Sequence, residues 1–327
     1  MADTHRLPNR QPDLIHVPPY LKPGDTIGIT SPAGMISPEE IQPCVTMLEG
    51  WGFKVLVGTS IGKAWGTFGG TDAERAGDLQ AMLDNDAIAA ILCARGGYGL
   101  VRIIDQLNFA QLQRHPKWLV GFSDVTVLHS HLNSRLWLAT LHSKMCSGFS
   151  DEDGPVTAAT LASVMSIRNA LTGQAVEYPI SPNAHHRSGV GIGAVVGGNL
   201  RTLETLTGTA SEIRTDNAIL LVEDTGEPLY AVDRMFWHLK RSGRLSRLAG
   251  LLVGGFSVPP DSNNDLPFVP DLVQIVMEKV RDYHYPVCFD FPVGHQSLNL
   301  AVKLGVLHQL VVKDGIANLT EMVRVNG

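Results

Sequence analysis

Ser123 stands where an apolar segment turns abruptly into a predicted helix. Residues 117–122, Lys-Trp-Leu-Val-Gly-Phe, are typical of a buried strand, and the helix is expected from Asp124 to Leu132. A serine at such a turn holds its hydroxyl exposed beside the free amides of the helix N-terminus, which is how several α/β folds present a nucleophile. The same position also suits a serine that only caps the helix. This segment alone leaves both roles open.

A glycine-rich turn follows another predicted strand. The apolar run Ala87–Cys93 ends in the turn Arg95-Gly96-Gly97-Tyr98-Gly99. Adjacent glycines allow positive φ angles and a close approach of the backbone to a ligand. Such amides serve either an oxyanion or a phosphate, but this turn lacks the Lys-Ser/Thr of a P-loop and the full Gly-x-Gly-x-x-Gly pattern. We therefore expect an oxyanion hole formed by the backbone amides of Asp124 and of Gly97 or Gly96.

An acidic side chain and a histidine follow predicted strands in the second half of the chain. Glu223 comes directly after the apolar run 218–222, and His295 follows the predicted strand 287–291 and a Pro-Val-Gly turn. A serine nucleophile needs a base within hydrogen-bond reach, and that base needs a partner that fixes its tautomer. Asp224 and Glu227 compete with Glu223 for the acidic role, although Glu227 is better placed to cap the helix that follows.

Four short segments carry a resemblance to a known family. They are Ala94-Arg95-Gly96-Gly97-Tyr98-Gly99, Gly121-Phe122-Ser123-Asp124, Val222-Glu223-Asp224-Thr225-Gly226-Glu227, and Phe291-Pro292-Val293-Gly294-His295 followed by Asn299. Their types and order resemble the LD-carboxypeptidases, that is, the muramoyltetrapeptide carboxypeptidases and the microcin-immunity peptidases. The overlap runs from about Pro23 to Leu319.

The resemblance implies a serine peptidase with Ser123 as nucleophile, Glu223 as acid and His295 as base. It implies cleavage of an L–D amide bond at the carboxyl end of a short peptide, with murein tetrapeptide as substrate, D-Ala as product and peptidoglycan recycling as the setting. It also implies a homodimer. The mechanism needs no cofactor.

Three alternatives remain at this point. The chain could hydrolyse a peptidyl- or aminoacyl-nucleotide, as microcin-immunity peptidases do, or it could be a non-catalytic ligand-binding module. An ordinary α/β-hydrolase shares the order serine, acid, histidine. However, Ser123 is embedded in Gly-Phe-Ser-Asp-Val, whereas that class uses Gly-x-Ser-x-Gly.

Substrate contacts are expected from five side chains. They are Arg95, Tyr230, Arg234, Trp237 and Lys144. Of these, Arg95, Arg234 and Lys144 could bind a substrate carboxylate, for which a bidentate arginine is physically favoured. Lys144 lies in Leu141–Met145, where many family members instead carry a Thr-His-Gly-Pro-like segment, so this departure bears on substrate preference.

Strand and helix patterns alternate along the chain, which predicts an α/β fold. We expect an N-terminal domain with a parallel sheet at 14–160, of the glutamine-amidotransferase or flavodoxin-like kind, and a linker at 161–190. A mixed α/β domain at 191–327 then carries the acid and the base. The active site would lie at the interface, because Ser123 belongs to one domain and its helpers to the other.

Composition narrows the class of protein. The chain has 327 residues, of which 44% are hydrophobic and 18% charged, with a net charge of −6. These values indicate a folded globular protein and argue against nucleic-acid binding. No apolar stretch is long enough for a membrane helix, and the polar, proline-rich residues 1–20 do not resemble a secretory signal. Four scattered cysteines suggest reduced thiols, and no metal site is expected. We therefore expect a cytoplasmic protein.

Overall fold

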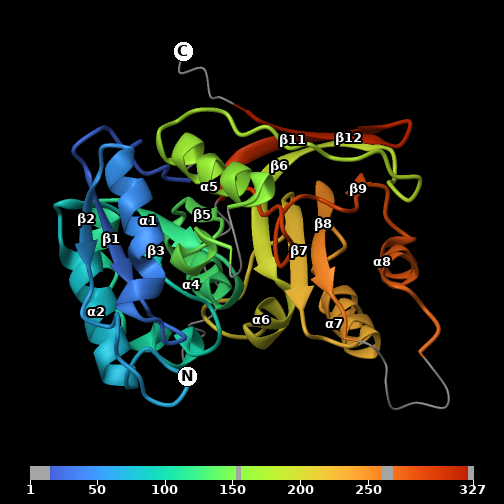
Figure 1. The fold of residues 1–327 in the computed structure, drawn as a ribbon. Helices are drawn as coiled ribbons and strands as arrows, with labels where there is room; N and C mark the ends of the chain where they lie inside the picture. The colour runs from blue at the N-terminus through green and yellow to red at the C-terminus, as the bar shows by residue number, and fades with distance from the viewer. Residues whose placement is uncertain (1–14, 152–155, 260–267, 323–327) are drawn as a thin grey trace.

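The computed structural model places the chain in two α/β units that lie side by side, the N-terminal half in blue to green and the C-terminal half in yellow to red (Figure 1). It describes residues 15–151, 156–259 and 268–322, so most of the polar N-terminal segment lies outside the described residues. Each unit is built on a six-stranded sheet. The expected fold class, two α/β domains, is confirmed.

The first sheet has the strand order β10-β5-β4-β3-β1-β2. Its five parallel strands are β1 (Thr26–Thr30), β2 (Lys54–Val57), β3 (Ile88–Cys93), β4 (Trp118–Gly121) and β5 (Thr140–His142). The sixth strand, β10 (Val302–Leu304), comes from the other end of the chain and pairs antiparallel with β5. The parallel sheet expected for this domain is therefore completed by one antiparallel strand that the sequence pattern did not reveal.

Five helices in the described part of the chain belong to this unit. They are α1 (Pro38–Gly50), α2 (Asp72–Asp84), α3 (Ala110–Arg114), α4 (Thr126–His131) and α5 (Ala158–Leu171). The hydroxyls of Ser37 and Thr71 form capping boxes with Glu40 and Glu74, which satisfy amides at the starts of α1 and α2. After the glycine turn, the apolar residues Ile103, Ile104 and Leu107 favour a helix in the sequence pattern. The chain instead forms two short 3₁₀ turns there, η1 (Leu100–Arg102) and η2 (Ile104–Gln106), and neither has a side-chain cap.

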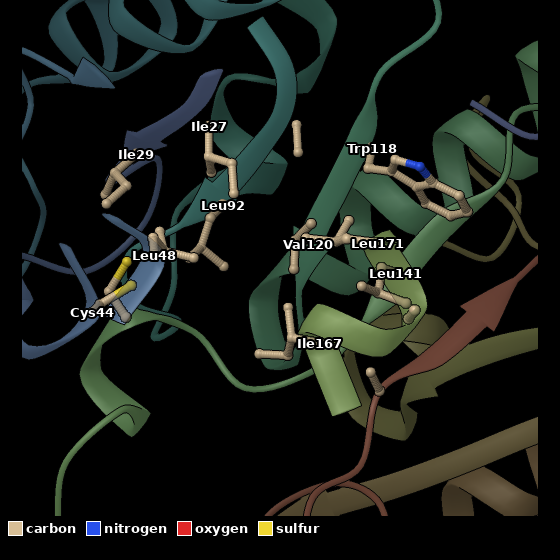
Figure 2. Close-up of a cluster of buried hydrophobic side chains, with 14 of the residues drawn as sticks. Ile27, Ile29, Cys44, Leu48, Leu92, Trp118, Val120, Leu141, Ile167 and Leu171 are labelled. Atoms are coloured by element: carbon tan, nitrogen blue, oxygen red, sulfur yellow. The ribbon is translucent and has the colours of Figure 1, made fainter. Parts of the chain in front are cut away.

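The main core of the first unit lies between this sheet and α1 and α5. Side chains of β1, β3 and β4, such as Ile27, Leu92 and Trp118, are buried together with Ile167 and Leu171 of α5 (Figure 2). Helix α5 thus packs with the first unit along its length, although the expected domain division assigns residues 161–171 to the linker.

The second sheet has the order β12-β11-β6-β7-β8-β9. Its strands are β6 (Gly189–Asn199), β7 (Ile219–Thr225), β8 (Gly250–Ser257), β9 (Val287–Cys288), β11 (Leu307–Lys313) and β12 (Ile316–Glu321). Strands β6 to β9 are parallel, whereas β11 and β12 are an antiparallel hairpin, so the expected mixed sheet is confirmed. The apolar pattern of residues 304–312 favours a single strand, but Gly305, at φ 84°, separates β10 from β11, and these residues are divided between the two sheets.

Three helices cover one face of the second sheet. They are α6 (Leu200–Thr205), α7 (Leu229–Arg241) and α8 (Leu272–Val280). Their apolar side chains share a core with β7 and β8. Other residues of β7 and β8 belong to a second buried cluster, together with residues of β10, β11 and β12. No helix within the described ranges is both long enough and apolar enough to cross a bilayer.

The two units meet where β6 runs against α4, near the centre of Figure 1. Asn199 N, at the end of β6, donates to Thr126 Oγ1 at 3.0 Å. Gly198 has no side chain at the point of closest approach, where a Cβ would lie 2.5 Å from the same hydroxyl oxygen. This contact brings the carboxyl end of β6, and of its neighbour β7, beside the carboxyl end of β4.

Candidate active site

Ser123 occupies a sharp turn at the end of β4. The strand ends at Gly121, Phe122 is extended, and Ser123 opens the 3₁₀ turn η3 (Ser123–Val125) with φ 62°. Left-handed backbone at a residue with a Cβ costs about 1–2 kcal/mol. Phe122, not Ser123, occupies the cap position, and no side chain makes a capping hydrogen bond there. The turn therefore presents the hydroxyl instead of using it as a helix cap.

The glycine turn after β3 packs directly against Ser123. A Cβ added to Gly96 would lie 3.0 Å from Ser123 Cβ and 3.1 Å from its Oγ, so a larger residue would crowd the hydroxyl. Gly97 has φ 106°, which a residue with a side chain rarely adopts. The buried Asp124 carboxylate accepts a hydrogen bond from Leu100 N at 2.9 Å and so joins the two turns. Burial raises the pKa of Asp124 to about 6, against the opposing effect of this hydrogen bond.

The backbone amides of Gly97 and Asp124 are available to a ligand. Within the described part of the chain, neither amide donates to a protein acceptor. Both residues line a cavity of about 320 Å³ together with Ser123. Residues of the second unit, including Asn199 and Asp224, form the other side of this cavity. The cavity is therefore located at the interface between the units, as expected.

Glu223 and His295 form a hydrogen-bonded pair. Glu223 is fully buried near the end of β7, and His295 lies on the loop after β9. The Glu223 Oε2 atom accepts from His295 Nδ1 at 2.6 Å and from the His295 backbone amide at 3.2 Å. A proton held on Nδ1 leaves Nε2 free to accept another. Burial lowers the pKa of His295, but the hydrogen bond and charge of Glu223, with the charge of Asp224, outweigh it and raise this pKa above its usual value.

Gly294 is the residue that lets this pair form. Its φ is 94°, and an added Cβ would lie 2.6 Å from both Cβ and Oε2 of Glu223. We expect Gly294→Ala to displace the carboxylate from Nδ1 and to lower kcat by roughly 10²- to 10⁴-fold, as loss of the orienting acid does in a serine triad. Proton NMR should show loss of the downfield Nδ1–H resonance.

Gly208→Ala is a matched control for this prediction. Gly208 also has a positive φ, 78°, but no atom within 4 Å of an added Cβ. It therefore tests backbone strain without the collision. Comparable loss of activity in both variants would contradict the assigned role of Gly294.

Phe122, the residue before Ser123, packs against the ring of His295. Its ring centroid is 4.8 Å from that of His295 and 5.8 Å from that of the buried His142. Among the described residues, no hydrogen bond joins Ser123 Oγ to His295. Catalytic hydrogen bonds are often long before substrate binds and tighten in the complex. The structure thus pairs Glu223 with His295 and places Ser123 directly after the aromatic residue that packs on His295.

Two acidic neighbours of Glu223 differ from expectation in their roles. Glu227 does not cap α7: the cap position is Pro228, and no side chain makes a capping bond there. Asp224 instead organises the end of β6, where it accepts from Asn199 Nδ2 at 3.0 Å and from Arg201 N at 2.9 Å. Asn199 was not predicted as a site residue. A signal was present, because a glycine pair, Gly197-Gly198, precedes it at the end of β6, and the pair Gly96-Gly97 likewise follows a strand.

None of the five expected substrate contacts lines the cavity around Ser123, and Lys144 alone among them lines a second cavity beside His295. Arg95 is half exposed and pairs with Glu40. Tyr230, Arg234 and Trp237 lie on α7, where Arg234 stacks over Tyr230 and Lys279 of α8 stacks over Trp237. Substrate binding by these four residues stays a prediction. In the parts of the chain that the structure describes, no three histidine, cysteine, aspartate or glutamate side chains gather as metal ligands would.

Comparison with known proteins identifies the family. Residues 27–143 match the LD-carboxypeptidase N-terminal domain, and residues 192–310 match the LD-carboxypeptidase C-terminal domain. A probable murein peptide carboxypeptidase of Bacillus subtilis is 33% identical over 301 residues, covering 89% of this chain and 90% of the relative. The chain belongs to the LD-carboxypeptidase family. The murein tetrapeptide carboxypeptidase of Pseudomonas aeruginosa is 29% identical, covering 85% of this LD-carboxypeptidase chain and 91% of that relative.

Solved structures agree with this assignment. The muramoyltetrapeptide carboxypeptidase of Oxalobacter formigenes has a TM-score of 0.77 and 25% identity, covering 91% of this LD-carboxypeptidase and 99% of that chain. An MccF-like protein of Bacillus anthracis has a TM-score of 0.81 at 20% identity, covering 94% of this chain and 100% of that one, which establishes a shared fold. The two-domain LD-carboxypeptidase architecture is confirmed.

Proposed function

We propose that this chain is a cytoplasmic serine carboxypeptidase that removes the terminal D-Ala of murein tetrapeptide, as a homodimer, during peptidoglycan recycling. Family membership supports the peptidase class, and the names of the Bacillus and Pseudomonas relatives support the substrate. The observation that carries the mechanism is the 2.6 Å hydrogen bond between Glu223 and His295 Nδ1, beside a serine held at positive φ.

In the proposed mechanism, His295 Nε2 takes the proton of Ser123 as Oγ attacks the carbonyl carbon of the L–D amide bond. The negative charge that develops on the carbonyl oxygen is held by the amides of Asp124 and Gly97, each worth about 3–4 kcal/mol in comparable sites. His295 then protonates the departing amine, and the C–N bond breaks. Water, deprotonated by the same imidazole, hydrolyses the acyl-enzyme. Throughout, Glu223 orients and stabilises the imidazolium.

The stereochemistry of the terminal residue tests this proposal. Purified protein is incubated with murein tetrapeptide and with its diastereomer ending in L-Ala, and the released alanine is resolved by chiral chromatography. We expect release of D-Ala from the first peptide and little release from the second. Absence of D-Ala release would refute the proposed substrate.

Two further assays on the purified protein test the alternative functions. An aminoacyl-sulfamoyl-adenylate turned over faster than murein tetrapeptide would favour the microcin-immunity activity. A fluorophosphonate probe that labels Ser123 only when His295 is present would eliminate a purely ligand-binding module. Light scattering tests the homodimer.

A further inference from the structure

A second cavity, of about 400 Å³, adjoins His295 and has a lining separate from that around Ser123. Phe122 and Met145 supply apolar walls, and Lys144 and Asn299 supply polar groups. No carboxylate is among its lining residues. Besides His295, Lys144 is the only ionisable side chain in this lining, so the cavity is suited to an anion.

Lys144 is held at this cavity with spare hydrogen-bonding capacity. Its stem lies against Gly148, where an added Cβ would be 3.1 Å from Lys144 Cδ. Nζ donates to Thr160 Oγ1 at 3.3 Å, and no carboxylate within the described ranges lies within 4 Å of it. Burial lowers the pKa of Lys144, and the charge of Asp151 opposes that effect. An ammonium has three donors, so two remain for a ligand.

Asn299 contributes an independent signal. Its side chain is 1% exposed, and its Oδ1 accepts from Gly294 N at 2.9 Å. That bond orients the amide, yet Nδ2 has no partner among the described residues. A buried donor without an acceptor costs about 1–3 kcal/mol, so such a group in a cavity points to a ligand that accepts from it.

Reaction chemistry decides which part of the substrate this cavity receives. In acyl transfer, the base returns its proton to the leaving amine, so the leaving group must lie against His295. The leaving group of a carboxypeptidase is a single amino acid, and its free α-carboxylate is the anion nearest to the bond that breaks. The oxyanion amides and Ser123 instead line the neighbouring cavity, which suits the acyl part.

We propose that Lys144 Nζ and Asn299 Nδ2 bind the free carboxylate of the departing C-terminal residue. This inference rests on the proposed carboxypeptidase function and deepens it. It makes Lys144 a specificity-determining residue, because a substrate without a terminal carboxylate offers no anionic acceptor to the remaining donors of a half-buried ammonium. Lys144 belongs to the segment Leu141–Met145, where this chain departs from the family pattern described above.

The test compares murein tetrapeptide with the same peptide ending in D-alaninamide. For the wild type we expect kcat/KM to be roughly 10- to 100-fold higher for the acid than for the amide, as hydrogen bonds to a charged group provide. Lys144→Met should lower kcat/KM for the acid by that factor. It should leave kcat/KM for the amide within about twofold of the wild-type value, since only the acid presents a charge to Lys144. Lys144→Arg should retain part of the preference.

Lys313→Met, at the exposed last residue of β11, controls for loss of a positive charge elsewhere. Equal loss on acid and amide in Lys144→Met, or no preference in the wild type, would overturn the inference while leaving the carboxypeptidase function standing. Failure of the wild type to cleave either peptide would instead refute the proposed function, and the inference with it. The two failures are therefore distinguishable.

Discussion

Replacement of Ser123 by alanine is expected to lower kcat for D-Ala release by about 10⁶-fold, the size of effect found when the nucleophile of a serine triad is removed. The reason is chemical: without Oγ no acyl-enzyme forms, and His295 has no hydroxyl to activate. The fold should survive, because among the described residues Ser123 makes no capping bond and its Oγ has no hydrogen-bond partner. Steady-state assays and circular dichroism provide the two measurements.

Ser297→Ala is the matched control for Ser123→Ala. Ser297 is exposed and lies on the same loop as His295, so its hydroxyl is close to the site without belonging to it. Turnover by this variant should stay near that of the wild type. Near-wild-type turnover by Ser123→Ala would exclude the nucleophile assignment.

Glu223→Gln is expected to change both the rate and its pH dependence. The glutamine can no longer stabilise the imidazolium, and the plateau of kcat should fall by about 10⁴-fold, as in other triads. The base acts only when His295 is neutral, so activity is lost as the pH falls through the pKa of His295. Glu223 raises that pKa whereas burial lowers it. Without the carboxylate charge, the acid limb of the profile should therefore move to lower pH.

The measurement is kcat/KM against pH for the wild type and the variant. The wild-type midpoint should lie above the ordinary histidine value of about 6.5, and the variant midpoint below that of the wild type. Glu49→Gln, on the exposed side of α1, removes one negative charge far from the site and should shift nothing. If the acid limb of the pH profile is unchanged or moves to higher pH in Glu223→Gln, the role of Glu223 as the partner of His295 would be contradicted.

The sequence indicated where Ser123, Gly97 and Glu223 lie in the fold because each is at or just past the carboxyl end of an apolar strand, whereas His295 lies on a loop seven residues beyond β9. Such runs identify buried parallel strands, and the carboxyl ends of those strands meet at one edge of a sheet. Ser123 and Gly97 follow this rule in the first sheet, and Glu223 in the second. The local sequence pattern could not reveal how close Ser123 lies to His295, because that distance depends on how α4 of the first unit packs on β6 of the second.

Substrate contacts were harder to predict for a similar reason. Trp237 was expected to help line the cleft, and its ring lies under Lys240 of the same helix and under Lys279 of α8, a residue distant in sequence. Lys144 was one of three residues expected to bind a substrate carboxylate, and it is the one of the three that lines the cavity beside His295. Strand β10 has three residues and pairs with a strand about 160 residues earlier, so no periodicity could have indicated it.

Strand β10 also bears on how the protein is made. Residues 302–304 leave the ribosome long after β5, which until then is an open edge of the first sheet. Unpaired edges invite association with other chains, and domains generally fold as they emerge during synthesis. A translation product that stops before residue 302 would carry the nucleophile turn on an unfinished sheet. Because His295 precedes β10 in the sequence, the first sheet can be completed only after Ser123, Glu223 and His295 have all been synthesised.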